Sequence, residues 1–156
     1  MAMERSFMMV KPDGVLRRLV GEVVSRIERK GLRLVAMKLI RMSDAQAREL
    51  YKVHEGRAFH PKLMKFITSG PVVVMCVEGL QAISTIRTML GKTFGSEAEP
   101  GTIRGDLAMS RGKNIVHGSD SAESVQRELP IFFKREELLD YPPVDLDWVY
   151  EPDEKG

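Results

Sequence analysis

The stretch GKNIVHGSDSAESVQRE, residues 112–128, contains side chains that could attack or bind a charged substrate. Its histidine, His117, follows a short apolar strand predicted over 114–116, so we expect it on a tight connection. The SDS triplet at 119–121 predicts a helix cap, and Glu123 completes a capping-box pattern with the aspartate three residues before it. Because helix starts attract anions and imidazole titrates near neutral pH, the segment suits chemistry on an anionic group.

A neutral imidazole needs no further activation to act as a nucleophile. With a reference pKa of about 6.5, roughly three quarters of free histidine is neutral at pH 7. One ring nitrogen of His117 could attack phosphorus while Glu128 holds the other and Ser119 bridges, provided that the next helix turns Glu128 back over the loop. The alternative is a loop histidine bonded only to backbone, and the local sequence leaves both open.

Further candidate ligands are scattered along the chain and are weak individually. Tyr51 and His54 lie three residues apart in a predicted helix and share a face. Arg104, in PGTIRGD, is flanked by turn glycines that favour a functional role. The remaining candidates are Lys11 at a strand end, Arg87 in a predicted helix and Phe59 before a helix. Together with the histidine, this set of cations, carboxylate and aromatic suits phosphoryl transfer, where catalysis is mostly positioning and charge neutralisation.

The elements that must position these residues follow from apolar periodicity and capping signals. Strands are predicted at 6–10, 32–42, 71–77 and 114–116, and helices at 15–30, 43–54, 61–68, 80–90 and from 121 onward. Ser43 and Gln46 give a capping box that opens the helix at 43–54. This order contains the split βαβ pattern of a ferredoxin-like α+β sandwich, βαββαβ, with an antiparallel four-stranded sheet and helices on one face. A small Rossmann-type sheet is the rival, but no glycine fingerprint lies between the second and third predicted strands.

Two segments show no regular period of this kind. Residues 91–113 lack a sustained pattern, and connections this long are usually functional or disordered. The segment supplies hydroxyls, backbone donors and arginines suited to phosphate. Near the C-terminus, apolar and acidic residues alternate over 144–150. This alternation predicts an extended arm, within 141–156, laid over an apolar surface that could belong to a neighbouring subunit.

The bulk composition is that of an ordinary globular protein. The chain has 156 residues, is 43% apolar and 29% charged, and carries a formal net charge of +2, so we expect one domain over 1–156 and no specific nucleic-acid or membrane partner. The single cysteine, Cys76, excludes an internal disulfide framework and fits a cytoplasmic location. His54 and His60 are six residues apart and no cysteine or histidine pair has zinc-ligand spacing, which argues against a protein-only zinc site.

Five motifs together resemble nucleoside diphosphate kinases over nearly the whole chain. NIVHGSDS at 114–121 resembles their specific active-site signature, N-x-x-H-G-S-D; the others are KPDGV at 11–15, SGPVVVMCVEG at 69–79, PGTIRGD at 100–106 and W-x-Y-E at 148–151. The resemblance implies a ferredoxin-like fold with an extra helical hairpin and a long active-site loop. It implies ping-pong phosphoryl transfer from ATP, GTP and other nucleoside triphosphates to nucleoside diphosphates, through a phosphohistidine and with broad nucleoside specificity. It also implies Mg²⁺ held mainly by nucleotide phosphates, with no protein metal ligands, and a homo-oligomer, a hexamer in preference to a tetramer.

The resemblance also implies a role for each matching residue. His117 matches the phosphorylated histidine, and the catalytic residues around it are Glu128, Ser119, Tyr51 and Lys11. The implied phosphate ligands are His54, Arg87, Thr93 and Arg104; the sugar ligands are Lys11 and Asn114; and the base clamp is Phe59 and Leu63. One departure is Phe94-Gly95, where the family usually has asparagine or aspartate followed by proline. The missing proline could cost from a few tenths to about 1 kcal/mol through the unfolded state.

Two other classes of protein could share these features. A non-catalytic nucleotide-binding regulator would use the same pocket, and a ferredoxin-like interaction module would function through its oligomer surface. The intact combination of His117 and Glu128 with Arg87 and Arg104 favours the enzyme, because a regulator has no reason to retain a nucleophile with its orienting carboxylate.

Overall fold

Two long apolar runs form the centre of a four-stranded sheet. β1 (Met3–Val10) pairs antiparallel with β3 (Pro71–Leu80) along its whole length, β2 (Arg33–Arg41) pairs with the other side of β3, and β4 (Val116–Gly118) pairs with β1. The resulting order, β2-β3-β1-β4, has antiparallel neighbours throughout. This arrangement confirms the predicted ferredoxin-like α+β fold.

The structure is a computed structural model that describes residues 3–155. The domain predicted from the sequence spans 1–156, and its positions 1, 2 and 156 lie outside the described residues. Within residues 3–155, no helix is long and apolar enough to cross a membrane.

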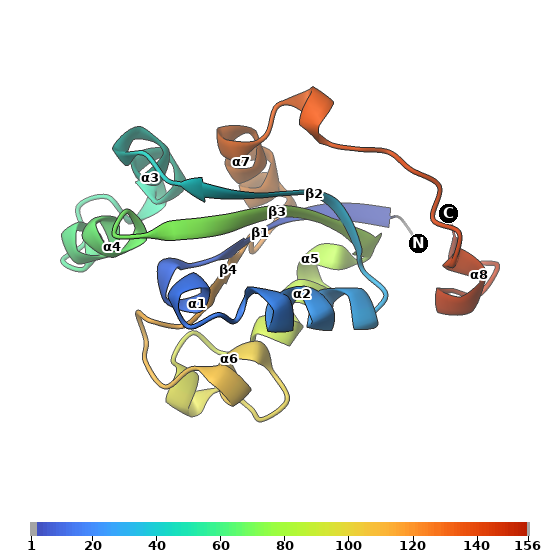
Figure 1. Cartoon of the computed structure of the whole chain (residues 1–156), viewed down its shortest axis with the longest axis horizontal. Helices are drawn as coiled ribbons and strands as arrows, with labels where there is room; N and C mark the ends of the chain where they lie inside the picture. The colour runs from blue at the N-terminus through green and yellow to red at the C-terminus, as the bar shows by residue number, and fades with distance from the viewer. Residues whose placement is uncertain (1–2, 156) are drawn as a thin grey trace.

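Helices cover both faces of the sheet (Figure 1). On one face, Phe7 and Met9 of β1 pack with α3 (Asp44–Leu50), α4 (His60–Ile67) and α7 (Ala122–Phe132). On the other face, Met8 and Val10 pack with α2 (Val20–Arg29) and α5 (Ala82–Leu90). The prediction of helices on one face only is therefore wrong. The reason is visible in β1, whose last four side chains are all 0% exposed, so both sides of the strand require cover.

The helix predicted over 15–30 is divided into two. α1 (Pro12–Leu16) begins with a proline in its first turn, and α2 begins after a break at Arg18, whose φ is 61°. The amide N–H of Leu19 donates to the carbonyl of Gly14 at 2.9 Å and closes the break. An amphipathic period alone does not reveal such a break, because Leu16 and Leu19 keep helical spacing across it.

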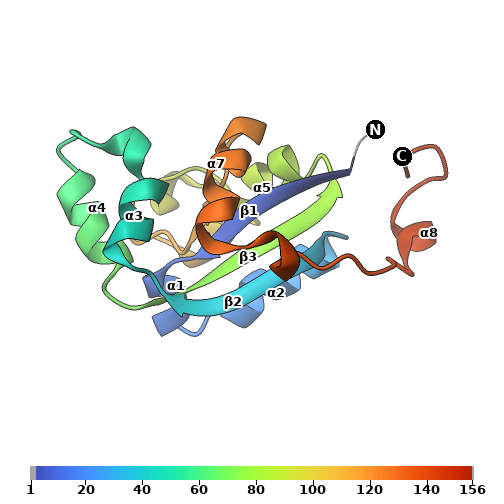
Figure 2. The ribbon, with the colours of Figure 1, turned by 90° about the horizontal axis from the view of Figure 1, so that it is seen from above.

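A helical hairpin is inserted between β2 and β3, as Figure 2 shows from above the sheet. It consists of α3, a single 3-10 turn η1 (Lys52–His54) and α4. The predicted capping box at the start of α3 is present, with Ser43 and Gln46 bonded reciprocally at 3.1 and 3.0 Å. The helix itself ends at Leu50, so Tyr51 and His54 lie at its end and in the following turn rather than in one continuous helix.

The segment 91–113 has more structure than the sequence predicts. It contains a 3-10 turn, η2 (Gly95–Glu97), and a short helix, α6 (Ile103–Leu107). The Thr102 hydroxyl caps α6 by accepting a hydrogen bond from the N–H of Gly105 at 2.9 Å. Both pieces are too short to produce a visible hydrophobic period.

The fourth strand lies two residues later than predicted. The sequence predicts 114–116, whereas β4 is Val116–Gly118, because Ile115 has a φ of 75° that no strand accommodates. His117 is therefore the central residue of the strand, not part of the connection after it. The predicted cap at 119–121 is confirmed, since α7 is capped by Ser121, which accepts from the N–H of Ser124 at 3.1 Å; the N-cap residue is Ser121 and not Asp120 as the capping-box pattern predicted.

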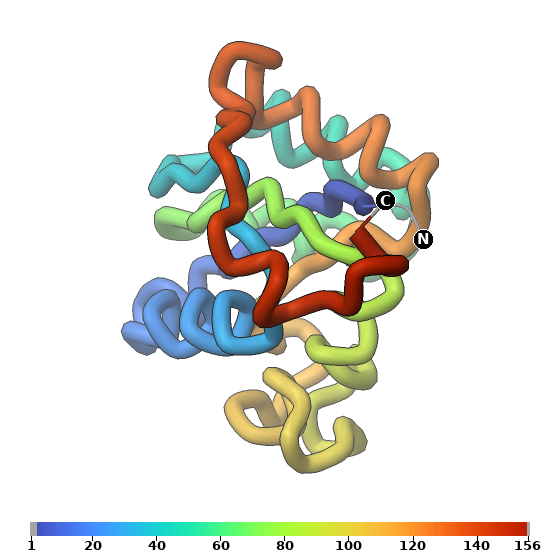
Figure 3. Tube along the Cα trace, turned by 90° about the vertical axis from the view of Figure 1, so that its right-hand side faces the viewer, coloured from blue at the N-terminus to red at the C-terminus, as the bar shows by residue number. Residues whose placement is uncertain are grey.

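After α7, the C-terminal segment runs back across one side of the protein (Figure 3). It passes through a 3-10 turn, η3 (Arg135–Glu137), and joins the outer edge of β2 where Leu139 N–H donates to the Val35 carbonyl at 3.1 Å. The alternating stretch is not wholly extended, because Leu146–Val149 forms one helical turn, α8. Of its side chains, Trp148 is 91% exposed in the single chain, whereas the Tyr150 hydroxyl accepts from Leu80 N–H at 3.2 Å.

Candidate active site

His117 lies on the sheet face that is covered by the hairpin and α7. It pairs with Met9, so both side chains point to the same face. The imidazole lies between two aromatic rings, with centroid distances of 5.9 Å to Phe7 and 5.9 Å to Tyr51, the latter in an edge-on arrangement at 84°. These contacts restrict the orientation of the ring while leaving the side chain 21% exposed.

A buried carboxylate holds one nitrogen of this imidazole. Glu128, one turn from the end of α7, places Oε1 2.7 Å from Nε2 of His117, and its Oε2 accepts a short hydrogen bond from the Ser119 hydroxyl. A carboxylate can only accept here, so Nε2 carries the proton. In the neutral ring, the lone pair then resides on Nδ1, so Nδ1 is the ring atom that could act as a nucleophile.

Three aromatic rings lead from the histidine to the surface. The Tyr51 ring stacks on His54 at 6.3 Å, and His54 meets Phe59 edge-on at 5.3 Å, with Phe59 46% exposed. Burial, followed by the charge of Glu128, raises the pKa of Tyr51, so its hydroxyl stays protonated. Burial and the nearby Arg57 cation lower the pKa of His54. Leu63 lies one turn after Phe59 in α4 and packs partly into the core.

Lys11 connects the end of β1 to the long loop. Its ammonium donates to the Gly112 carbonyl and to Asn114 Oδ1, both at 2.8 Å, and lies 5.3 Å from the centroid of the Phe66 ring. Burial lowers its pKa to about 8, although the charge of Asp13 opposes the shift. The Asn114 amide in turn donates to the Thr93 carbonyl at 2.9 Å, which brings two more predicted ligands into the same network.

The two predicted arginines are held differently. Arg104 is buried and donates to three carbonyls, those of Asn114 at 3.2 Å, Gly91 at 3.1 Å and Val116 at 2.7 Å. Burial, followed by the charge of Arg87, lowers the pKa of Arg104 to about 10. Arg87 is exposed and makes one long contact, 3.4 Å, to the Gly118 carbonyl. Arg104 therefore ties both ends of the loop to the strand of His117, whereas Arg87 is freer to meet a ligand.

The site thus combines a histidine held by a buried carboxylate with three cations and a stacking surface. A family model described as "Nucleoside diphosphate kinase" matches residues 4–138, which is most of the chain. The chain belongs to the nucleoside diphosphate kinase family. As a nucleoside diphosphate kinase, it is a phosphotransferase that moves a phosphoryl group from a nucleoside triphosphate to a nucleoside diphosphate.

Curated relatives and a solved structure agree with this assignment. The chain is 53% identical to the nucleoside diphosphate kinase of Staphylococcus haemolyticus over 96% of this chain and 100% of the relative. It is 51% identical to nucleoside diphosphate kinase B of Rattus norvegicus over 96% of this chain and 98% of the relative. The solved structure of a halophilic nucleoside diphosphate kinase from Halobacterium salinarum in complex with CDP superposes with a TM-score of 0.94. That chain is 45% identical, and the match covers 96% of this chain and 100% of the other.

Two residues at the kinase site are not among the candidates predicted from the sequence. Phe7 flanks the histidine and stacks on Phe132 at 5.2 Å and 3°, yet it occurs in an unbroken apolar run that predicts only core. Asp13 accepts the backbone N–H of Ile115 at 3.0 Å. The only signal for it is its place in KPDG directly after a strand, where the chain turns.

The departure at Phe94-Gly95 has a steric basis. A Cβ on Gly95 would lie 2.4 Å from the Ala108 carbonyl oxygen, so any other residue there would displace the loop. The Phe94 ring lies beneath the Arg111 guanidinium, with 5.4 Å between Cζ and the ring centroid. The loop is therefore packed through these two residues instead of being stiffened by a proline.

Proposed function

We propose that the enzyme works by a ping-pong mechanism through a phosphohistidine at His117. The observation that carries the proposal is the 2.7 Å contact between Nε2 of His117 and Oε1 of Glu128, which leaves Nδ1 as the free lone pair. In the first half-reaction, Nδ1 attacks the terminal phosphorus of the triphosphate. A phosphorus–nitrogen bond forms, the bond to the bridging oxygen breaks, and the nucleoside diphosphate leaves with that electron pair. A second diphosphate then takes the phosphoryl group by the reverse step.

Glu128 and Ser119 support this step without forming bonds to phosphorus. The imidazole gains positive charge as Nδ1 attacks, and the Glu128 carboxylate stabilises that charge through Nε2. The Ser119 hydroxyl donates to the other carboxylate oxygen and so fixes its direction. Tyr51 keeps its proton and lies against the imidazole edge-on, which suits a donor beside the transferred phosphate.

The cations around the nucleophile suit the phosphates of the substrate. We assign the phosphates to Arg87, Arg104, His54 and Thr93, and the sugar hydroxyls to Lys11 and Asn114, with Lys11 also near the phosphates. Support comes from the shared network in which Lys11, Asn114 and Thr93 are bonded in sequence. Charge neutralisation by positioned cations is the main source of catalysis in phosphoryl transfer.

Broad nucleoside specificity follows from how the base would be held. Phe59 is half exposed at the outer end of the aromatic series, and Leu63 lies one turn further along α4. A ring stacked on Phe59 is bound through its π-face, which every base has. Hydrogen bonds to base edges would instead discriminate strongly.

The proposed metal is Mg²⁺ that arrives bound to the nucleotide. Among residues 3–155, no group of three or more His, Cys, Asp or Glu side chains is arranged to hold a metal ion, and the site groups are cationic. These residues fit a metal held mainly by phosphate oxygens, where it would neutralise phosphate charge. A homo-oligomer, with a hexamer preferred over a tetramer, and a cytoplasmic location remain predictions from the sequence.

The decisive experiment is charging without an acceptor. Incubation with ATP and Mg²⁺ should leave one phosphoryl group per chain, in a phosphoramidate bond that is labile in acid and stable in base. Any nucleoside diphosphate should discharge it to the matching triphosphate, and His117→Ala should abolish charging. Intact-mass measurement before and after acid decides the outcome. An acid-stable adduct, a charged His117→Ala protein, or turnover with no adduct would each overturn the proposal.

A further inference from the structure

A strained turn immediately precedes the reactive histidine. The N–H of Val116 donates to the carbonyl of Asn114, two residues back, at 2.8 Å, which defines a γ-turn centred on Ile115. Ile115 has a φ of 75°, which is rare and strained for a β-branched residue. Such a conformation persists only where surrounding groups determine it.

Both backbone groups of Ile115 are bonded to one short segment of the chain. Asp13 Oδ2 accepts its N–H at 3.0 Å, and its carbonyl accepts the N–H of Lys11 at 2.8 Å. Gly14 brings this segment close, because a Cβ there would lie only 3.0 Å from the Ile115 carbonyl oxygen and 2.6 Å from Val10 Cγ1. Asp13 is buried. Its bond to Ile115 is made by a side chain, whereas the bond from Lys11 is made by the backbone.

The position of the turn decides which way the histidine faces. β4 is three residues long, and His117 is its middle residue, paired with Met9. At the far end of the strand, Ser119 N–H donates to the Phe7 carbonyl at 3.0 Å. Because side chains alternate along a strand, a shift of one residue would turn the imidazole to the opposite face of the sheet, away from Glu128. So short a strand has few ladder bonds to resist such a shift.

We propose that Asp13 is a positioning residue for the reaction: its carboxylate holds the γ-turn at Ile115 and thereby sets the register in which His117 meets Glu128. This inference rests on the proposed role of His117 as the nucleophile. The hydrogen bond of the Asp13 carboxylate goes to the backbone of Ile115, and its charge also acts on Lys11 and Arg104, so positioning must be separated from charge.

Two substitutions separate positioning from charge, since Asp13 also favours the charged form of Lys11. Asp13→Asn keeps an acceptor oxygen at the same place and removes the charge. Asp13→Glu keeps the charge but carries the acceptor one methylene further into a segment that Gly14 shows to be tightly packed. Asp44→Ala, an exposed aspartate in the first turn of α3, is the control for loss of a carboxylate near a helix start.

The measurement is the single-turnover rate of His117 phosphorylation at saturating ATP and Mg²⁺, with the dissociation constant for ADP measured separately. Positioning predicts that Asp13→Asn charges within about threefold of wild type, while Asp13→Glu charges about 100-fold more slowly, since a misplacement near 1 Å costs about 10²-fold. The dissociation constant for ADP should change less than the rate in both variants. With only three histidines in the chain, ¹⁵N labelling should also show His117 losing its Nε2-protonated tautomer in Asp13→Glu.

The opposite ranking, with Asp13→Asn slow and Asp13→Glu near wild type, would overturn the proposed positioning role. It would show that Asp13 acts through its charge. In that case the defect of Asp13→Asn should shrink at pH 6, where Lys11 is protonated in either protein. Equal charging rates in all variants would also refute the inference. Each of these results differs from failure of the proposed function, which would appear as absence of a phosphohistidine in the wild-type enzyme itself.

Discussion

Nε2 of His117 and Oε1 of Glu128 are 2.7 Å apart, although one belongs to the shortest strand of the sheet and the other to the last turns of α7. The carboxylate is buried, and its second oxygen is bonded to Ser119, so it is directed at one nitrogen of the ring. The pair therefore determines the tautomer of the nucleophile before any substrate binds.

Replacing this carboxylate should slow charging without abolishing it. Glu128→Gln keeps the size of the side chain but removes the charge that, in the proposed mechanism, stabilises the imidazole as it attacks phosphorus. A hydrogen bond to a charged group is worth about 1.5–3 kcal/mol, so the single-turnover rate should fall roughly 10- to 100-fold. Glu123→Gln, exposed on the same helix, is the control. An unchanged rate in Glu128→Gln would remove Glu128 from the mechanism.

The two arginines should respond differently to truncation. Arg104→Ala removes three hydrogen bonds to backbone carbonyls, so the free energy of unfolding should fall by about 3 kcal/mol, together with kcat. Arg87→Ala breaks one long contact and should lower kcat with a stability change below about 1 kcal/mol. Urea unfolding and steady-state kinetics distinguish the two. Variants that altered only KM would show uniform binding rather than transition-state stabilisation.

The pH dependence of kcat/KM should reflect the ionisation of Lys11. Its pKa is lowered to about 8 by burial, so the free enzyme loses this cation above that pH. We expect kcat/KM to fall as pH rises through about 8, since kcat/KM reports the ionisation of the free enzyme. Lys11→Arg should move this decline to higher pH, because arginine stays protonated. A decline that persisted unchanged in Lys11→Arg would assign it to another group.

The same shift has a consequence for stability. The folded-state pKa of Lys11 lies below the ordinary lysine value of 10.5, so between about pH 8 and 10.5 the unfolded chain holds a proton that the folded chain lacks. The contribution of Lys11 to the free energy of unfolding therefore rises with pH across that window. The difference in unfolding free energy between wild type and Lys11→Met, measured at pH 7.5 and pH 10, should shift in favour of wild type at the higher pH. A difference that is independent of pH would contradict the shift.

Phe59→Ala should weaken the binding of every nucleotide by a similar factor. Loss of one stacking partner costs about 1–3 kcal/mol per base, and no edge contact is proposed. Because Phe59 is half exposed, stability should change little. Calorimetric titration with ADP, GDP, CDP and UDP tests this, with Phe59→Tyr as the control that retains a ring. Selective loss of guanine nucleotides alone would indicate an edge contact instead.

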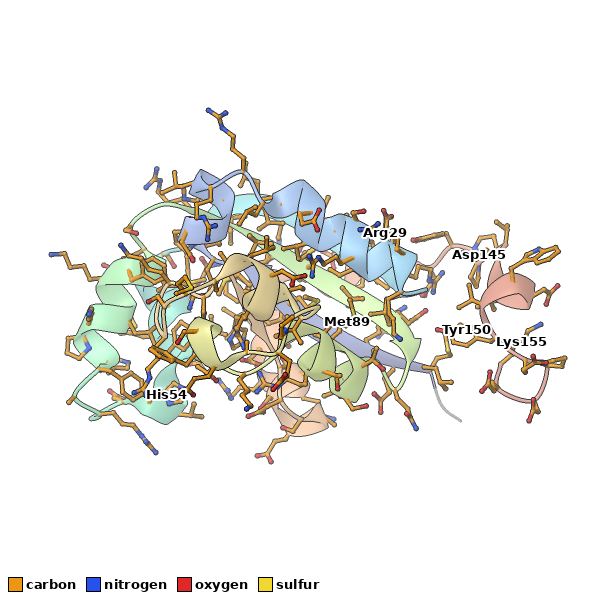
Figure 4. All side chains as sticks on the ribbon, turned by 90° about the horizontal axis from the view of Figure 1, so that it is seen from below. Arg29, His54, Met89, Asp145, Tyr150 and Lys155 are labelled. Carbon is orange, nitrogen blue, oxygen red and sulfur yellow. The ribbon has the colours of Figure 1, made fainter. Side chains whose placement is uncertain are left out.

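The exposed tail predicts an oligomer. Figure 4 shows Tyr150 and Lys155 at the opposite end of the molecule from His54, so the tail does not complete its own site. Trp148, the only tryptophan, is 91% exposed in the single chain, and we expect a neighbouring subunit to cover it. The fluorescence emission of Trp148 should therefore shift to longer wavelength when the oligomer dissociates. The molecular mass measured by light scattering at micromolar concentration should exceed that of one 17.6 kDa chain. A single-chain mass with fully solvated emission would contradict both expectations.

Local sequence determined much of this protein. The capping box at Ser43 and Gln46 formed as predicted, because both partners lie within one turn. The apolar runs of β1 and β3 predicted buried strands, and the order of elements predicted the ferredoxin-like sheet. The HGSD motif and its companions indicated the family, because those residue types at those spacings are specific to it.

Tertiary structure decided what depends on residues far apart in the chain. The shift of β4 by two residues and the second helical layer both arise from contacts that no local pattern contains. Ile115 is the clearest case. Its own preferences disfavour a φ of 75°, and a carboxylate 102 residues away holds it there. The sequence identifies His117 as a candidate. The orientation of its side chain depends on Glu128 and Asp13, which come close to His117 and Ile115 only in the folded chain.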